Sequence, residues 1–147
     1  MNPYAFYSVH DRMDQQLLND LTQSINGEYS AIHCYEQLAK KAPNEEERKQ
    51  ILEIRDDEMK HFHTFSNLYV QLTGKKPVPK IIESCPRDYC DGLQFALKDE
   101  QKTVDFYHEI ADRTKNRSIR KKFRRAAVDE QNHAVWFLYY YVKHCRK

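Results

Sequence analysis

Apolar residues recur every three to four positions along four stretches of the chain, the spacing that places them on one face of a helix. Pro43 and Asn44 separate the first two stretches, and Gly74 is expected to end the second. The stripes predicted to face the core include Leu72 and Leu138. The pattern predicts helices over about 11–41, 45–72, 87–115 and 118–144.

The segment 75–86 carries Pro77, Pro79 and Pro86 and is predicted to be non-helical. With a few flanking residues it can span about 40–50 Å when extended, roughly the length of such a bundle. It can therefore carry the chain back so that the second and third helices run parallel. The sequence predicts an all-α protein, a four-helix bundle with a long crossover between helices two and three, and residues 1–147 as a single domain.

The same arrangement of acidic, imidazole and phenol side chains occurs twice, 72 residues apart. In each copy a glutamate and a histidine stand three apart in an Asp-Glu-x-x-His segment, so on a helix they share one face. Another glutamate lies thirty residues upstream, and a tyrosine follows that glutamate by seven. The residues so related are Glu28, Tyr35, Asp57, Glu58 and His61 in the first copy and Glu100, Tyr107, Asp129, Glu130 and His133 in the second.

The position of the four glutamates relative to the predicted turns places them at one height. Glu28 and Glu58 are each fifteen residues from a turn at 43, and Glu100 and Glu130 are each fifteen residues from a turn at 115. In antiparallel helices an equal distance from the turn means an equal height, here about 22 Å from the turns at about 1.5 Å per residue. The four carboxylates are therefore expected to converge at the middle of the bundle.

Four carboxylates cannot be buried together without neutralising charge, because an unpaired buried carboxylate is costly and takes up a proton instead. No lysine or arginine falls in the inner stripes at that height. Two divalent cations would balance four negative charges. One Glu from each of two helices plus Glu-x-x-His from each of the other two is the pattern of di-iron and di-manganese bundles. A single Glu-x-x-His is common by chance, but two copies with matching upstream glutamates favour a two-metal site.

On these residues the chain resembles the ferritin-like superfamily over nearly its whole length, most closely the bacterioferritin and rubrerythrin branches. The resemblance implies that Glu58 and Glu130 bridge two metals and are the catalytic centre of the site. It also implies that the terminal ligands are Glu28 with His61 and Glu100 with His133. The expected cofactor is two iron ions, although imidazole and carboxylate suit manganese or zinc as well.

The resemblance further implies oxidation of Fe(II) by dioxygen or hydrogen peroxide, so the protein is expected to be a di-iron peroxidase or ferroxidase. Reduction of hydrogen peroxide with an unknown electron donor would be rubrerythrin-like. Iron oxidation and sequestration would be bacterioferritin-like. A different class is a stress-linked protein in which the metal is structural and a basic patch over 117–125 binds nucleic acid; a solvated face is the ordinary interpretation of that patch.

Three departures from these families shape the expectation. Rubrerythrins usually carry a further glutamate where this chain has Thr103, and they usually add a rubredoxin domain whose cysteines are missing here. Cage-forming ferritins add a fifth helix, whereas this sequence stops at Lys147. A homodimer rather than a cage is therefore expected, and hydrogen peroxide reduction is favoured. Met59 stands where bacterioferritins ligate haem, with packing as the alternative.

The repeat also predicts outer contacts to the ligands. Asp57 and Asp129 each precede the motif glutamate by one residue, which turns them about 100° around the helix towards a neighbouring helix. Asp57 is expected to hydrogen-bond His133, and Asp129 to hydrogen-bond His61, because metal-bound histidines usually donate to a carboxylate. Tyr35 and Tyr107 are expected within reach of the bridging glutamates of the opposite half.

Location and cysteine state are inferred from what the sequence lacks. It shows no charged segment followed by an apolar stretch at its start and no apolar run of about 18 residues, so neither export nor a membrane span is predicted. The four cysteines form no C-x-x-C pair. A cytoplasmic location with mostly free thiols is expected, with a redox disulfide between Cys85 and Cys90 as the alternative. The net charge of +2 supports no strong electrostatic inference about partners.

Overall fold

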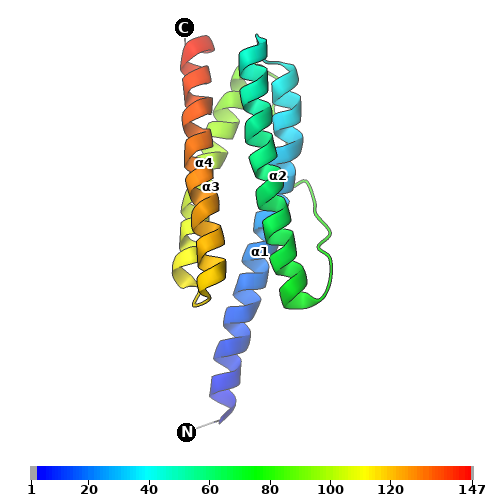
Figure 1. The fold of residues 1–147 in the computed structure, drawn as a ribbon, viewed down its shortest axis with the longest axis vertical. Coiled ribbons are helices and arrows are strands. Elements are labelled where there is room, and N and C mark those ends of the chain that lie inside the picture. Colours follow the sequence, from blue (N-terminus) through cyan, green and yellow to red (C-terminus); the bar gives the residue numbers. More distant parts are fainter. Residues whose placement is uncertain (1–2, 147) are drawn as a thin grey trace.

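Four long helices make up the regular structure of the part of the chain that is described (Figure 1). The structure is a computed structural model, which describes the backbone of residues 3–146 and the side chains of residues 15–146. It confirms the all-α four-helix bundle. The helices are α1 (Pro3–Lys40), α2 (Glu45–Thr73), α3 (Tyr89–Arg113) and α4 (Arg117–His144).

Two antiparallel hairpins form the bundle. α1 packs mainly on α2, and α3 packs mainly on α4. The crossover between α2 and α3 returns along the bundle, so that α2 and α3 run in the same direction, as the sequence predicts (Figure 1). Across the hairpins, α1 is the neighbour of α3 and α2 is the neighbour of α4. None of these helices, within the described residues, is apolar over a length sufficient to cross a lipid bilayer.

Short capping contacts set the ends of the helices. The Asn44 side chain accepts from the Glu47 backbone N–H at 2.9 Å at the start of α2, and Gly74 ends α2 in the left-handed conformation at φ 70°. Asp88 accepts from the Asp91 N–H at 3.0 Å. An N-cap residue lies outside the helix itself, so α3 begins at Tyr89 rather than near residue 87.

The crossover is attached to α1 at three points spaced four residues apart on one face of that helix. Two attachments are hydrogen bonds from backbone N–H groups of the crossover, and the third is a disulfide. Because residues four apart lie above one another on a helix, the crossover follows α1 as an extended strap. The attachments are Lys80 N to Asn26 Oδ1 (2.8 Å), Ile82 N to Ser30 Oγ (2.9 Å), and Cys34 Sγ to Cys85 Sγ.

All four cysteines are paired, as Cys34–Cys85 and Cys90–Cys145. The expectation of free thiols is therefore wrong, and so is the Cys85–Cys90 pairing. Neither disulfide can be recognised from the sequence, because each joins residues more than fifty positions apart. They meet only because the crossover returns to α1 and because the first turn of α3 lies beside the last turn of α4. Since stable disulfides are typical of oxidising compartments, the cytoplasmic location loses this support and stays a prediction.

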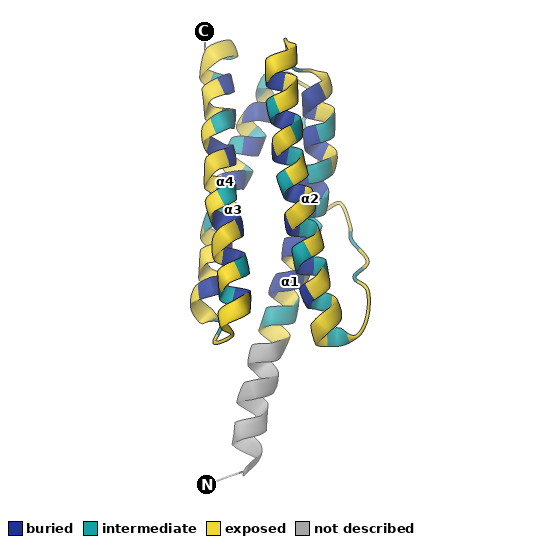
Figure 2. Cartoon of the chain, in the orientation of Figure 1, coloured by how far each residue is buried: buried dark blue, intermediate teal, exposed yellow. Residues whose placement is uncertain are grey.

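Two apolar clusters lie above and below the middle of the bundle, and the buried positions line its interior (Figure 2). One is built around Phe65 and Phe123, whose rings stack at 4.5 Å between centroids. Leu72 and Leu138, predicted to face the core, are 48% and 46% exposed. Leu68 is the last buried residue of α2, so the inward stripe ends one turn earlier than the spacing suggests. The largest fully buried side chains are Tyr35, Tyr107, Phe65, Phe123, Phe137, Leu21, Ile25, Leu38, Ile51, Ile54, Leu93 and Ile110.

A buried glutamate, Glu47, joins three helices at the end of the bundle. It accepts from Tyr89 Oη at 2.9 Å and from Lys143 Nζ at 3.2 Å, and it is paired with His144 Nε2. Burial alone would raise the pKa of Glu47, but the hydrogen bonds from His144 and Tyr89 hold it below its usual value. Spacing along the sequence does not indicate this network, because the partners of Glu47 come from distant helix ends.

The disulfide near the chain ends should contribute measurably to stability. Replacing both cysteines, Cys90→Ala with Cys145→Ala, opens a loop whose ends are 55 residues apart. The free energy of unfolding, measured by urea denaturation without reductant, is expected to fall by about 2–4 kcal/mol. Adding reductant to the unsubstituted protein should destabilise it in the same direction. Four titratable thiols in the denatured, unreduced protein would contradict the pairing.

Candidate metal centre

Six side chains that the repeat singles out meet at mid-height in the bundle, with at least one from each helix. All are buried, with at most 7% of their surface exposed. The structure therefore brings together every residue that the sequence predicts as a ligand. These residues are Glu28 of α1, Glu58 and His61 of α2, Glu100 of α3, and Glu130 and His133 of α4.

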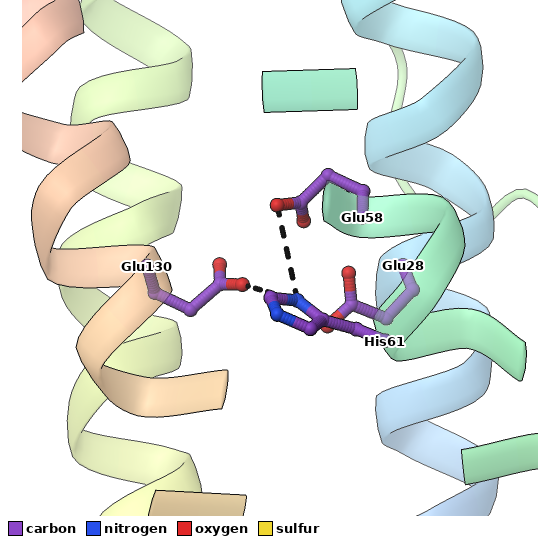
Figure 3. Close-up of side chains that lie close together, drawn as sticks. All are labelled: Glu28, Glu58, His61 and Glu130. Atoms are coloured by element: carbon purple, nitrogen blue, oxygen red, sulfur yellow. Dashed lines mark ion pairs between the residues drawn. The ribbon is translucent and has the colours of Figure 1, made fainter. Parts of the chain in front are cut away.

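The six residues form two overlapping sets, each able to surround one ion. In each set the potential ligand atoms lie within 4.8 Å of one another. The first set is drawn in Figure 3, where Glu130 reaches across from α4 towards the ring of His61. Two glutamates, Glu58 and Glu130, belong to both sets. The sets are Glu28, Glu58, His61 and Glu130, and Glu58, Glu100, Glu130 and His133.

Each of the six side chains has one buried atom without a hydrogen-bond partner. His61 Nδ1 lies 3.0 Å from Glu130 Oε1, and His133 Nδ1 lies 2.9 Å from Glu58 Oε1. These contacts are close, yet they lack the geometry of a hydrogen bond. Since buried polar atoms are almost always satisfied, six unsatisfied atoms facing one another fit a pair of cations. The atoms are Glu28 Oε2, Glu58 Oε1, His61 Nδ1, Glu100 Oε2, Glu130 Oε1 and His133 Nδ1.

The outer nitrogen of each imidazole contacts an aspartate on the facing helix. His61 Nε2 lies 3.0 Å from Asp129 Oδ2, and His133 Nε2 lies 3.1 Å from Asp57 Oδ2. The sequence predicts both contacts, because each aspartate directly precedes the glutamate of its Glu-x-x-His motif. Burial raises the pKa of both aspartates, but hydrogen bonds, chiefly from Lys60 and His133 to Asp57 and from His61 to Asp129, bring it below the usual value. Each ionised aspartate therefore accepts the Nε2–H and leaves Nδ1 facing the centre.

The two tyrosines hold glutamates other than those predicted. Tyr35 donates to Glu100 Oε1 and Tyr107 donates to Glu28 Oε1, whereas the sequence predicts that they reach the glutamates shared by both sets. The reason is topological, because the hydroxyl group of Tyr35 on α1 reaches the neighbouring helix α3, whereas α4 lies on the diagonal of the bundle. Burial and the adjacent carboxylates raise the pKa of both phenols. Each therefore remains a donor and fixes one oxygen of its glutamate.

Protons stand in for positive charge when the centre carries no cation. Burial, together with the other glutamates, raises the pKa of Glu58 and of Glu130 well above the usual value. Burial lowers the pKa of His133, but Glu100 outweighs it and brings the value to about 9. Burial also lowers the pKa of His61, but the negative charge of Glu28 outweighs it and raises the pKa above its usual value. The cluster thus attracts positive charge strongly, whether as protons or as metal.

Comparison with known proteins is consistent with this geometry. The family model described as Rubrerythrin matches residues 19–85 and 91–145. This chain belongs to the rubrerythrin family. It is 53% identical over 137 residues to the uncharacterized protein YhjR of Bacillus subtilis (strain 168), a match covering 93% of this chain and 94% of the relative. A hypothetical protein from Pyrococcus furiosus has a similar fold, with a TM-score of 0.76 and 24% identity over 86% of this chain and 88% of that one.

Met59 and the basic patch are two surface features of this rubrerythrin-family chain that the sequence suggests as binding sites. Met59 is 39% exposed, so it does not pack in the core of this chain. The basic patch 117–125 is partly engaged within the molecule. Arg125 pairs with Asp129 at 2.9 Å and Arg124 with Asp112 at 3.5 Å. Haem and nucleic-acid binding both stay predictions that these contacts do not test.

A cavity of about 170 Å³ opens beside the centre on the side of α1, α3 and the crossover. We call it the α1–α3 cavity. Three of the buried glutamates reach it, together with Glu83 of the crossover and Asp99 of α3. The sequence offers no sign of Glu83, because it lies in an irregular segment whose path is set by the fold. Burial and the negative charges of Glu83 and Glu100 raise the pKa of Asp99 to about 8.

The aspartate that holds His61 should matter for metal affinity. Asp129→Asn is expected to leave the fold intact and to weaken the binding of divalent metal by roughly 10–100-fold, because the imidazole loses its fixed orientation. Competition with a chromophoric chelator measures the affinity. Asp56→Asn, an exposed aspartate paired with Arg55, is the matched control and should bind as the unsubstituted protein does. Equal metal affinities in the two variants would show that Asp129 does not support metal binding.

Metal-free protein should lose stability as pH rises. Glu58 and Glu130 have a pKa above the ordinary 4.5, and the pKa of His133 rises from 6.5 to about 9. In each case the folded protein keeps a proton that the unfolded chain releases at lower pH. The resulting stability is present below the unfolded pKa and is lost as pH rises through the folded one.

Thermal unfolding of chelator-treated protein should therefore give a lower melting temperature at about pH 8 than at about pH 5.5. Glu28, Asp57 and Asp129 have lowered pKa values, so their contributions are lost only below this window. Metal-loaded protein should show the opposite trend, because metal binding requires deprotonated ligands. A flat profile for the metal-free protein would contradict the burial of the cluster.

Proposed function

We propose that this protein is a di-iron oxidoreductase that reduces hydrogen peroxide, or dioxygen, with electrons from an external donor. The observation that carries the proposal is the sharing of Glu58 and Glu130 between two sets of potential ligands. Sharing of this kind is what a pair of adjacent ions requires. The membership of the rubrerythrin family supports the same reaction class.

The ligand chemistry supports two divalent first-row metals. Four carboxylates balance two doubly charged ions, and one imidazole is available to each. The same ligands suit iron, manganese and zinc, and the family favours iron. Two-metal sites of this kind hold their ions about 3.5–4 Å apart. When bound, iron supplies the redox chemistry, giving electrons to the oxidant and regaining them from the donor.

The chain's own residues position the site and limit what reaches it. Tyr107 and Tyr35 hold one oxygen each of Glu28 and Glu100, so that the other oxygen faces the centre. The α1–α3 cavity, at about 170 Å³, admits a few water-sized molecules. Hydrogen peroxide is of that size. Each peroxide reduced takes two electrons and two protons and yields two waters.

A second candidate function uses the same centre with iron as the substrate. In a ferroxidase, Fe(II) enters, is oxidised and leaves or is stored. The carboxylates along the α1–α3 cavity favour this alternative, because they would attract cations to the centre. The two functions differ in products: catalytic peroxide consumption sustained by a reductant supports the first, and accumulation of many ferric ions per chain supports the second.

Removing a shared glutamate should eliminate both functions. Glu58→Ala is expected to reduce the bound metal from two ions per chain to fewer than one, and to bring peroxide consumption to background. Metal analysis on folded protein, checked by circular dichroism, measures the first, and a coupled peroxide assay the second. Glu53→Ala, at an exposed position on the same helix, is the control. Two ions per chain in Glu58→Ala would rule out the shared-ligand assignment.

A further inference from the structure

The α1–α3 cavity connects the surface of the protein to the proposed metal centre. At its outer side lies Glu83 of the crossover, which is exposed. At its inner end lie Glu28, Glu58 and Glu130, each at most 2% exposed. A small solute entering beside the crossover would therefore pass along the wall of α3 before it meets the ligands.

Acidic side chains outnumber basic ones along this cavity. Its charged lining consists of five carboxylates and a single ammonium group, that of Lys102. On the other side of the centre, a second hollow between α2 and α4 reaches His61, and its charged lining is Lys121, Lys122 and Arg125. A divalent cation is attracted to the first opening and repelled by the second. The charge distribution thus distinguishes the two sides of one site.

The inner end of the cavity carries unsatisfied polar atoms. Glu28 Oε2, Glu58 Oε1 and Glu130 Oε1 are buried without a hydrogen-bond partner, and all three residues line the cavity. These atoms are independent of the acidic wall nearer to the surface. They indicate that a positively charged ligand belongs at the end of this path.

Between the surface and those atoms, two carboxylates from different segments line the cavity together. Asp99 comes from α3, and Glu83 comes from the crossover. Glu83 sits between two attachment points of the strap, since Ile82 N–H bonds to Ser30 and Cys85 is joined to Cys34. A side chain on an irregular segment is thereby held opposite a side chain on a rigid helix.

We propose that Glu83 and Asp99 form a transient binding site for divalent cations, on the path by which Fe²⁺ enters the metal centre. The site supplies two oxygen ligands, and water completes the shell of a cation that is still partly hydrated. The cation then moves inward to Glu28 and Glu58, whose charge is more deeply buried. This inference rests on the proposed metal centre and adds to it the route and the intermediate stop.

Kinetics of metal uptake tests the proposal separately from catalysis. Metal-free protein is mixed with Co²⁺ in a stopped-flow instrument, and the visible absorbance of the bound ion is followed. Release is then started with excess chelator. Glu83→Gln and Asp99→Asn, alone and combined, are compared with Glu109→Gln, which neutralises an exposed glutamate of α3 outside the cavity.

In the variants that lack Glu83 or Asp99, uptake and release of Co²⁺ should both become slower, because a binding site on the path lowers the barrier in both directions. The double variant is expected to take up Co²⁺ about tenfold more slowly, within the range by which charged clefts raise association rates. Its final stoichiometry should stay at two ions per chain with nearly unchanged affinity. Lys102→Gln should accelerate uptake, and Glu109→Gln should leave it as in the unsubstituted protein.

The possible outcomes distinguish a failure of the proposed entry route from a failure of the metal centre. Unchanged uptake in Glu83→Gln, whose side chain is exposed and whose loss is not expected to unfold the chain, overturns the transient site. Slower uptake with normal release and weaker affinity also overturns it, because that result describes a general attraction rather than a stop on the path. Fewer than two Co²⁺ ions at equilibrium in the unsubstituted protein would instead overturn the metal centre itself.

Discussion

Four carboxylates buried together at the middle of the bundle are the constraint on which the rest of this structure depends. Taking a single charge out of water costs several kcal/mol even after the protein relaxes, so such a cluster persists only with compensating positive charge. Among the described residues, the charged partners of these glutamates at the centre are His61 and His133. Two protonated imidazoles balance at most half of the charge, so that protons on the carboxylates must supply the remainder. Alternatively, two divalent cations balance all four charges while the imidazoles bind them as neutral ligands.

The contacts that orient the centre are also the contacts that join the two halves of the fold. Each imidazole is held by an aspartate, and Glu28 and Glu100 are each held by a tyrosine. All four of these contacts run between the α1–α2 hairpin and the α3–α4 hairpin. Docking of the hairpins and assembly of the site are therefore one event. The apolar clusters exclude water from the bundle above and below the centre, and the Glu47 network and the Cys90–Cys145 disulfide join distant segments at one end.

The sequence predicts most of the metal centre because the residues that form it follow a short-range spacing that occurs twice in the chain. The spacing of Glu58 and His61 along one helix, and the recurrence of that spacing 72 residues later, fix which side chains share a face. The aspartate contacts follow from the same helical geometry. The tyrosine partners could not be predicted in the same way, because they depend on which helices are neighbours and which are diagonal.

Other features depend on segments that have no periodicity. The path of the crossover decides that Cys85 meets Cys34 and that Glu83 faces Asp99, and no spacing rule describes an extended strap. Two positions of the apolar stripes were also misjudged. Leu72 lies beyond Leu68, the last buried residue of α2, and Leu138 lies beside the inward stripe of α4, between the buried Phe137 and Tyr140. Periodicity thus predicted the helices and their inner faces, and tertiary contacts decided the remainder.

The most direct test of the account is the anomalous scattering of crystals of iron-loaded protein, measured on both sides of the iron absorption edge. The account predicts two peaks at mid-height, about 3.5–4 Å apart, each beside one histidine and both in contact with Glu58 and Glu130. A single peak, or iron bound only at the protein surface, would contradict it.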